Sequence, residues 1–236
     1  VRPRVVILGG GVGGTIVANR LARSLRRGEA EVVVVDGTGR HVYQPGLLYV
    51  PFHNHDPESL VRPVRRLLNR RVEFVRGTAT RIDPQAQTVL VEDEVLTFDW
   101  LVLATGTRLA PERIPGFSAA HHFYDLDGAS RLRAALKEVE AGRIVVGPSR
   151  KVYKCPPAPL EFVLLLDDDL RRRRLRDRID LQFVSPFPEV FPGKKVARLI
   201  APLLDAQGIR VTTDFTVQEM SPGTVRAHDG REVRCD

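Results

Sequence analysis

Three glycines and an aspartate near the start of the chain have the types and spacing needed to bind a dinucleotide. Gly9, Gly11 and Gly14 follow an apolar run, and Asp36 ends the next one. In such a turn the first glycine permits a tight bend, the second lets the backbone approach a pyrophosphate, and the third allows a helix to pack closely on a strand. The free N–H groups of that helix bind phosphates, and the carboxylate accepts the ribose hydroxyls. The pattern predicts an adenine-dinucleotide site, because an ordinary glycine-rich turn would leave Asp36 unexplained.

Cys155 is the residue best suited to nucleophilic chemistry. It precedes Pro156, Pro157 and a predicted helix, and Lys151 and Lys154 lie nearby in the sequence. A helix N-terminus and neighbouring cations both favour the thiolate, which is the reactive form of cysteine. The alternative is a buried structural cysteine. We expect a reactive thiol, because the prolines hold the segment in an exposed turn.

Two consecutive α/β units are expected to position these residues. Short apolar runs bounded by turn residues predict strands, and longer runs with helical spacing predict helices. In the first unit the expected parallel strands are 5–8, 32–35, 71–75 and 101–104, the last of them buried, and antiparallel strands are expected within 76–100. One helix is expected after Gly14, and a second is expected from Glu58 or Ser59 to about Asn69. A long loop is expected over 37–60. In the second unit the expected helices are 129–140, 159–174 and 194–206, and the expected strands are 143–146, 179–184, 209–212, 215–219, 224–227 and 232–233. We therefore predict an α/β fold of two Rossmann-like dinucleotide-binding domains, residues 1–110 with an antiparallel β excursion and residues 111–236 with the cysteine turn.

The composition is that of a globular protein with a basic surface. The chain has 236 residues, 43% of them apolar, and a formal net charge of +7. No stretch approaches the roughly 18 to 20 apolar residues of a membrane-spanning helix, and the first residues do not form a cleavable leader. The arginine run 171–178 is expected to be mostly solvated, and a basic face suits an anionic substrate or lipid surface. No nucleic-acid-binding motif accompanies the charge, so we do not expect that partner. We also expect no metal site. Two cysteines are too few for a disulfide framework, and Cys235 is expected to be structural.

Several segments together carry a resemblance to a known family. The glycine turn and FDWLVLATGT (98–107) resemble flavoproteins with two dinucleotide domains, in which the second segment closes over FAD. The segment HVYQPGLLYVP (41–51) resembles a loop of membrane-associated quinone reductases, and VYKCPPAPLE (152–161) and SPFPEVFPG (185–193) resemble segments of the sulfide:quinone oxidoreductases. The resemblance implies FAD as the cofactor and places the loop containing Gln44 and Pro45 against the flavin ring. The residues expected to bind FAD are Gly9, Gly11, Gly14, Asp36, Gln44, Pro45, Ala79, Ala104, Thr105 and Gly106.

The resemblance also implies a chemical role for the cysteine segment. Cys155 is expected to react with sulfide and pass electrons by way of the flavin to a quinone, in a protein bound peripherally to a prokaryotic cell membrane. Glu161 either relays a proton or interacts with the helix dipole, and His121 and His122 either relay a proton or form a surface pair. In the family the disulfide partner, a Gly-Asp segment that completes the FAD site, and the membrane-docking helices lie in a C-terminal portion. We therefore expect this chain to be a fragment with an incomplete first domain.

Two other functions are left open by the sequence. An NADH:quinone oxidoreductase is related, but it needs a second glycine-rich turn, and the strand at 143–146 is followed by GPSRKVYKC, with bulky and cationic side chains. A noncatalytic remnant that keeps the FAD fold as a binding module is the third possibility.

Overall fold

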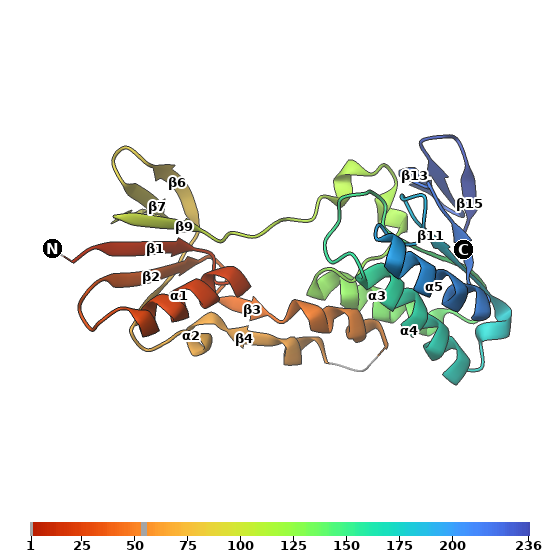
Figure 1. Ribbon diagram of the computed structural model, residues 1–236, viewed down its shortest axis with the longest axis horizontal. Helices are drawn as coiled ribbons and strands as arrows, with labels where there is room; N and C mark the ends of the chain where they lie inside the picture. Colours follow the sequence, from red (N-terminus) through yellow and green to blue (C-terminus); the bar gives the residue numbers. More distant parts are fainter. Residues whose placement is uncertain (1, 53–55) are drawn as a thin grey trace. The chain divides into compact units, whose positions relative to one another are not determined.

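The computed structural model describes residues 2–52 and 56–236. The chain divides into two compact units, one of Val1–Tyr43 with Glu58–Arg108 and the other of Gln44–Pro57 with Leu109–Asp236 (Figure 1). In the part of the chain that the structure describes, no helix is both long enough and apolar enough to cross a membrane.

The first unit is built on a four-stranded parallel sheet with strand order β5-β2-β1-β9. Helix α1 connects β1 to β2, as the glycine turn predicts, and β1 pairs in parallel with β2 and β9. This is the strand–turn–helix–strand unit of a Rossmann-like fold. The bounds are β1 Arg4–Leu8, α1 Val12–Ser24, β2 Glu31–Asp36, β5 Val72–Arg76 and β9 Trp100–Leu103.

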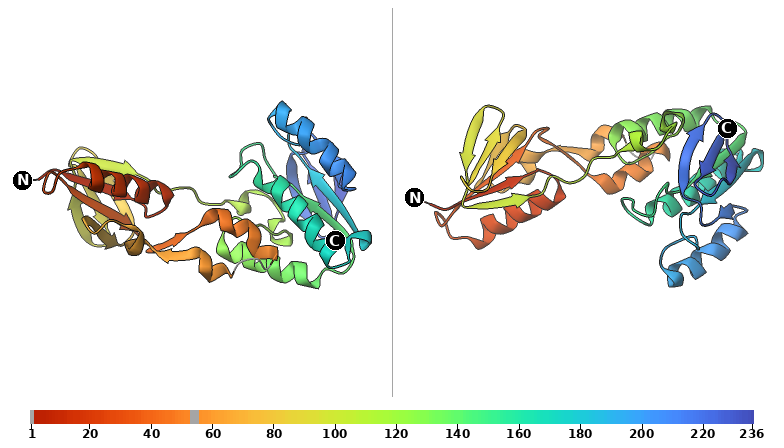
Figure 2. Two further views of the ribbon diagram at one scale, coloured as in Figure 1. Left: turned by 60° about the horizontal axis from the view of Figure 1, so that its bottom comes forward. Right: turned by 90° about the horizontal axis from the view of Figure 1, so that it is seen from above.

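Alternate residues of β1 and β2 face two different apolar layers. Val5 and Ile7 pack toward α1, whereas Val6 and Leu8 pack toward Val89 and its neighbours in a second sheet. This second sheet is the predicted antiparallel excursion, and it lies on the other side of the parallel sheet from α1 (Figure 2, right). Because both faces are covered, the strands are apolar throughout. The second sheet contains β6 Ala79–Asp83, β7 Thr88–Val91 and β8 Glu94–Thr97.

Two predictions for the first unit are wrong. Strand β9 is not buried, since Trp100 and Leu103 are 68% and 65% exposed and the strand lies at the sheet edge. The expected helix ending at about Asn69 is only the short α2, Val64–Leu67, because Pro63 cannot continue a helix from the residues before it. Residues before Pro63 form the short helix η2, Pro57–Leu60, and strand β4, Val61–Pro63, which pairs with β3, Arg40–Val42.

The second unit repeats the parallel arrangement, with strand order β10-β11-β12. Helix α4 connects β10 to β11, and helix α5 connects β11 to β12. Because both right-handed crossovers step along the sheet in the same direction, both helices lie on one face of the sheet (Figures 1 and 2). An antiparallel sheet follows, and Phe215, Val217 and Ala227 form a core with Val184 of β11. The bounds are α3 Leu126–Glu138, β10 Gly142–Val146, α4 Ala158–Arg172, β11 Ile179–Val184, α5 Lys194–Ala206, β12 Arg210–Thr212, β13 Val217–Ser221, β14 Thr224–Ala227 and β15 Glu232–Arg234, with short helices η3 Pro111–Arg113, η4 Phe117–Ala119 and η5 Arg176–Arg178.

The segment predicted as a long loop is folded, and part of it belongs to the second unit. Gln44–Phe52 is the 3-10 helix η1, and it packs against α3 and α4. Leu47, Leu48 and Val50 are buried, and the ring of Phe52 lies 5.2 Å from that of Phe162 in α4. Burial of these apolar side chains favours an ordered helix over a loop. The predicted domain 1–110 thus contains residues that pack with the other unit. The part of the predicted loop at residues 53–55 lies outside the described residues.

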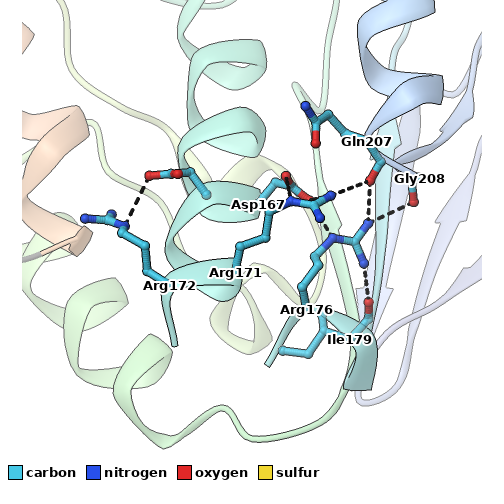
Figure 3. A network of polar contacts seen from close by, with 8 residues as sticks. Asp167, Arg171, Arg172, Arg176, Ile179, Gln207 and Gly208 are labelled. Atoms are coloured by element: carbon cyan, nitrogen blue, oxygen red, sulfur yellow. Dashed lines mark hydrogen bonds and ion pairs between the residues drawn. The ribbon is translucent and has the colours of Figure 1, made fainter. Parts of the chain in front are cut away.

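Most of the arginine run is exposed, as predicted, but Arg173 and Arg176 are half-buried. Arg176 is only 14% exposed and binds the buried Asp167 carboxylate at 2.5 Å, while Arg171 binds the same carboxylate at 2.7 Å. Arg176 also donates to the backbone carbonyls of Gln207 and Gly208 after α5 (Figure 3). These arginines therefore join the end of α4 to the end of α5.

Candidate dinucleotide site and cysteine site

Two of the predicted glycines are required by packing within the protein itself. Gly9 has φ +108°, and a Cβ there would lie 2.2 Å from the carbonyl oxygen of Ala104. A Cβ on Gly14 would lie 1.8 Å from the carbonyl oxygen of Gly9. No side chain fits at these distances, so both glycines bring α1 and the residues after β9 close to the turn.

The other glycines of the site face open space. Among the residues that the structure describes, none lies within 4 Å of a Cβ added at Gly11 or at Gly106. Gly11 is the N-cap of helix α1, with no side-chain cap and no acidic residue in the first turn of the helix, so the first N–H groups of α1 are available to an anion. The residues at this turn therefore fit a pyrophosphate, and an added Cβ at Gly11 would fill the space that it needs.

Asp36 is held by the backbone of its own unit. Its Oδ2 accepts the N–H of Gly10 at 2.8 Å, and its Oδ1 accepts the N–H groups of Thr38 and Gly39 and the Thr38 hydroxyl. Burial acts to raise the pKa of Asp36, but the four hydrogen bonds outweigh it and the pKa is lowered. The carboxylate thus remains charged and fixes the turn, and Oδ2 keeps acceptor capacity for a ribose hydroxyl.

The structure adds residues to this turn that the sequence did not indicate. A Cβ on Gly10 would lie 2.8 Å from Val64 of α2, and the Gly10 carbonyl lies 3.0 Å from Nδ1 of His41. The run of three consecutive glycines was the available signal, but only the GxGxxG positions were assigned roles. Gly10 is therefore a third structural glycine, and it lets Asp36 reach the turn.

The remaining predicted FAD residues have different surroundings. Ala104 lies at the turn, where its N–H donates to the Leu8 carbonyl at 2.8 Å, and Thr105 and Gly106 are exposed beside it in sequence. Ala79 begins β6 and packs against the first unit's core. Gln44 and Pro45 are exposed at the start of η1 and belong to the second unit. The structure brings Gly9, Gly11, Gly14, Asp36 and Ala104 together, and contact of the others with FAD stays a prediction.

Cys155 is an exposed free thiol in the second unit. Its φ of +57° lies in the left-handed region, which is unfavourable for a residue with a side chain and is common at functional sites. Its carbonyl accepts the N–H of Ala158 at 3.0 Å, which forms a tight turn before α4. The thiol is therefore accessible, in contrast to a buried structural cysteine, and its reactivity stays a prediction.

The start of α4 offers few amide donors to this thiol. Pro156, Pro157 and Pro159 have no N–H, and the N–H groups of Leu160 and Glu161 both donate to the Pro157 carbonyl at 3.0 Å. The helix dipole is present, but in the described part of the chain these first amides are absent or already used. The expected helix N-terminus effect on Cys155 must therefore act through the dipole alone.

Tyr124, Tyr153 and Lys154 lie near the cysteine turn. The Lys154 ammonium donates to the Tyr124 carbonyl at 3.1 Å and lies 5.4 Å from the Tyr124 ring centroid. Burial lowers the pKa of Lys154, although Asp125 and Cys155 act in the opposite direction. The Tyr153 hydroxyl donates to the Pro156 carbonyl at 3.1 Å. Lys154 is thus the cation nearest in sequence to the thiol, as expected.

The other candidates near the cysteine have weaker support. Glu161 is exposed in the first turn of α4, which suits either the dipole role or a proton relay. His121 is exposed and burial lowers its pKa, whereas His122 is half-buried and its Nδ1 lies 3.3 Å from the Tyr124 N–H. Cys235 is half-exposed, and burial raises its pKa. His122 is therefore not a purely surface residue.

The fold and the glycine turn define the class of protein, an α/β protein with a Rossmann-like dinucleotide site. Residues 3–149 match the model of the pyridine nucleotide-disulphide oxidoreductase family, and the chain belongs to that family. FAD is the cofactor of this family, as the sequence predicts for this chain. The predicted fold class is confirmed.

Known proteins of two kinds are similar to this chain. It is 27% identical to the mitochondrial sulfide:quinone oxidoreductase of Dictyostelium discoideum, over 87% of this chain and 47% of the relative. It is 30% identical to external NADH-ubiquinone oxidoreductase 2 of Saccharomyces cerevisiae, over 100% of this chain and 48% of the relative. The solved structure of the Aquifex aeolicus sulfide:quinone oxidoreductase matches with a TM-score of 0.86 at 23% identity, over 98% of this chain and 56% of that chain. The chain spans about half the length of the curated relatives it matches.

Proposed function

We propose that this chain is part of a flavoprotein that oxidises sulfide at Cys155 and passes the electrons to a quinone. The observation that carries the proposal is that Cys155, just before α4, is exposed and has a left-handed backbone conformation. The unit that contains it otherwise has the shape of a second dinucleotide domain. Similarity to sulfide:quinone oxidoreductases supports the choice of substrate. A strained backbone at an accessible thiol is typical of a site kept for chemistry.

The dinucleotide turn of the first unit supplies the FAD site in this proposal. The first N–H groups of α1 hold the pyrophosphate, the open side of Gly11 lets it approach, and Asp36 accepts a ribose hydroxyl through Oδ2. Ala104, Thr105 and Gly106 lie along the cofactor, and Gln44, Pro45 and Ala79 are the further predicted contacts. When bound, FAD accepts two electrons and delivers them to the quinone.

Cys155 performs the sulfur chemistry. Hydrosulfide attacks a disulfide that includes the Cys155 sulfur, so that one S–S bond forms as another breaks and a thiolate leaves. Glu161 in the first turn of α4 relays the proton released, unless it serves only as a dipole partner. Because the quinone is lipid-soluble, we propose peripheral contact of the whole protein with a prokaryotic cell membrane, to which the basic net charge of the chain is suited.

A second candidate, an NADH:quinone oxidoreductase, is favoured by the similarity to the yeast NADH-ubiquinone enzyme. The turn after β10 argues against it. A Cβ on Gly147 would lie 2.1 Å from the Val184 carbonyl, so this glycine is required by internal packing and, unlike Gly11, leaves no open approach for a pyrophosphate. Cationic Arg150 and Lys151 follow it in the chain.

The test uses the complete gene product purified with its flavin. Anaerobic sulfide is expected to bleach the flavin absorption in the wild type and in Cys235→Ser, and Cys155→Ser is expected to abolish the bleaching. A full bleaching rate in Cys155→Ser would remove the role given to that thiol. Bleaching by NADH but not by sulfide would favour the second candidate, and a folded protein that retains no flavin after gel filtration would identify a noncatalytic remnant.

A further inference from the structure

The Tyr124 hydroxyl is a buried polar group without a hydrogen-bond partner among the described residues. A buried hydroxyl left unpaired is destabilising and is uncommon in native proteins. Such a group is available to donate to a partner that is present only in another chemical state of the site. Tyr124 precedes α3, in the same unit as the cysteine turn.

The Tyr124 ring is held from two sides. It stacks on Phe123 with ring centroids 4.8 Å apart, and Phe123 stacks on Phe162 of α4 at 4.9 Å. Lys154, the residue before Cys155, binds the Tyr124 carbonyl and lies near the ring. Because these contacts fix the ring beside the cysteine turn, its hydroxyl has little freedom to find a partner elsewhere.

The sulfur of Cys155 lacks the donors that usually stabilise a thiolate at a helix start. The prolines at 156, 157 and 159 carry no N–H, and the hydroxyl of Tyr153 already donates to the Pro156 carbonyl. Cys155 is exposed, so its side chain is free to rotate about χ1. A fixed, unpaired hydroxyl is complementary to a sulfur that has no amide donors.

We propose that Tyr124 is a positioning residue whose hydroxyl donates a hydrogen bond to the sulfur of Cys155 when that sulfur is a thiolate or a persulfide. The proposal rests on the proposed function, which makes Cys155 the reacting sulfur. Burial, followed by the proximity of Cys155 and Tyr153, raises the pKa of Tyr124. Tyr124 therefore keeps its proton over the pH range in which a thiol ionises and acts as a donor, not as an acid.

Several ionisable groups lie close enough to Cys155 to interact with it. Tyr124, Tyr153 and Lys154 interact with Cys155 electrostatically, and Asp125 acts on Lys154. A substitution that removes one hydroxyl and keeps both the ring and the lysine therefore isolates the hydrogen bond. Tyr124→Phe does so, because Lys154 binds the backbone carbonyl of residue 124.

The experiment measures the alkylation rate of Cys155 by iodoacetamide against pH, by intact mass, in a Cys235→Ser background. Tyr124→Phe is expected to raise the midpoint of the pH profile by about one unit, which slows alkylation at neutral pH about tenfold. Tyr153→Phe is the matched control and is expected to leave the midpoint unchanged, because its hydroxyl is already used. Unchanged far-UV circular dichroism establishes that each variant is folded.

An unchanged midpoint in Tyr124→Phe, or equal shifts in both tyrosine variants, would overturn the proposal. The readout needs neither flavin nor sulfide, so it is separate from the test of the proposed function. A shifted midpoint without bleaching of the flavin by sulfide would retain the donor and reject the sulfide reaction. Bleaching by sulfide with an unshifted midpoint would retain the sulfide reaction and reject the hydrogen bond from Tyr124.

Discussion

Residues of one sequence motif have different physical roles at this dinucleotide turn. Gly9 and Gly14 are glycines because the backbone of the same unit occupies the place of a side chain. Gly11 is different, since a Cβ there would meet no other described residue within 4 Å. The spacing identified all three, but only the packing separates glycines that serve the fold from the one that serves a ligand.

This difference predicts that replacing glycine by alanine has different effects at Gly9 and at Gly11. Gly9→Ala is expected to lower the free energy of unfolding by about 2 kcal/mol or more, because it adds a close contact with Ala104 and strains a positive φ. Gly11→Ala is expected to cost less than about 1 kcal/mol but to weaken FAD binding. Urea unfolding measures the first effect, and flavin retention by the complete gene product measures the second. Equal destabilisation by the two substitutions would contradict the assigned roles.

At the scale of elements, buried charges join helices that would otherwise meet through few contacts. Asp167 of α4 has a 5% exposed side chain and binds both Arg171 and Arg176, and Arg176 reaches the carbonyls after α5. Arg173 similarly donates to the Leu136 and Val139 carbonyls at the end of α3. The second unit thus uses its arginines as crosslinks between helix ends.

Adjacent aspartates in α4 provide a matched test of this network. Asp167→Ala is expected to lower the free energy of unfolding by about 3 to 5 kcal/mol, since it leaves the buried Arg176 without its carboxylate. Asp168 pairs with Arg172 at the surface, both side chains being more than half exposed, so Asp168→Ala is expected to change stability by less than about 0.5 kcal/mol. Urea unfolding of the two variants measures the difference. Similar losses would show that the network contributes no more than a surface ion pair.

At the scale of the whole molecule, the chain order and the packing units do not coincide. Helix η1 follows β3 of the first unit in sequence, yet its buried residues pack on α3 and α4. The chain therefore passes from the first unit to the second and returns before completing the first sheet with β5 and β9.

Hydrogen exchange tests the assignment of η1 to the second unit. In Asp167→Ala under native conditions, amides of η1 are expected to exchange faster together with those of α4, by up to about a hundredfold, because both open with the destabilised unit. Amides of β1 and β2 are expected to keep their wild-type rates. Peptide-level mass spectrometry resolves these segments. Faster exchange in α4 with unchanged exchange in η1 would assign η1 to the other unit.

The sequence by itself determined the elements whose signals are local. The glycine spacing, the apolar runs of β1 and β2 and the bounds of β11 and α5 follow from backbone sterics and periodicity, which neighbouring residues specify. The exposure of β9 depended on its place at the edge of the sheet, and the strand β4 depended on pairing with β3, neither of which is local.

Only the tertiary structure decided what those elements contact. In the folded chain η1 packs on α3 and α4, and Arg176 is buried against Asp167. Backbone amides occupy most of the Asp36 carboxylate, and the Tyr124 hydroxyl has no partner among the described residues. The physical reason is that burial and hydrogen-bond satisfaction are set by partners tens of residues away in the chain. The residue types predicted the site's chemistry, and the packing decided which groups remain available to perform it.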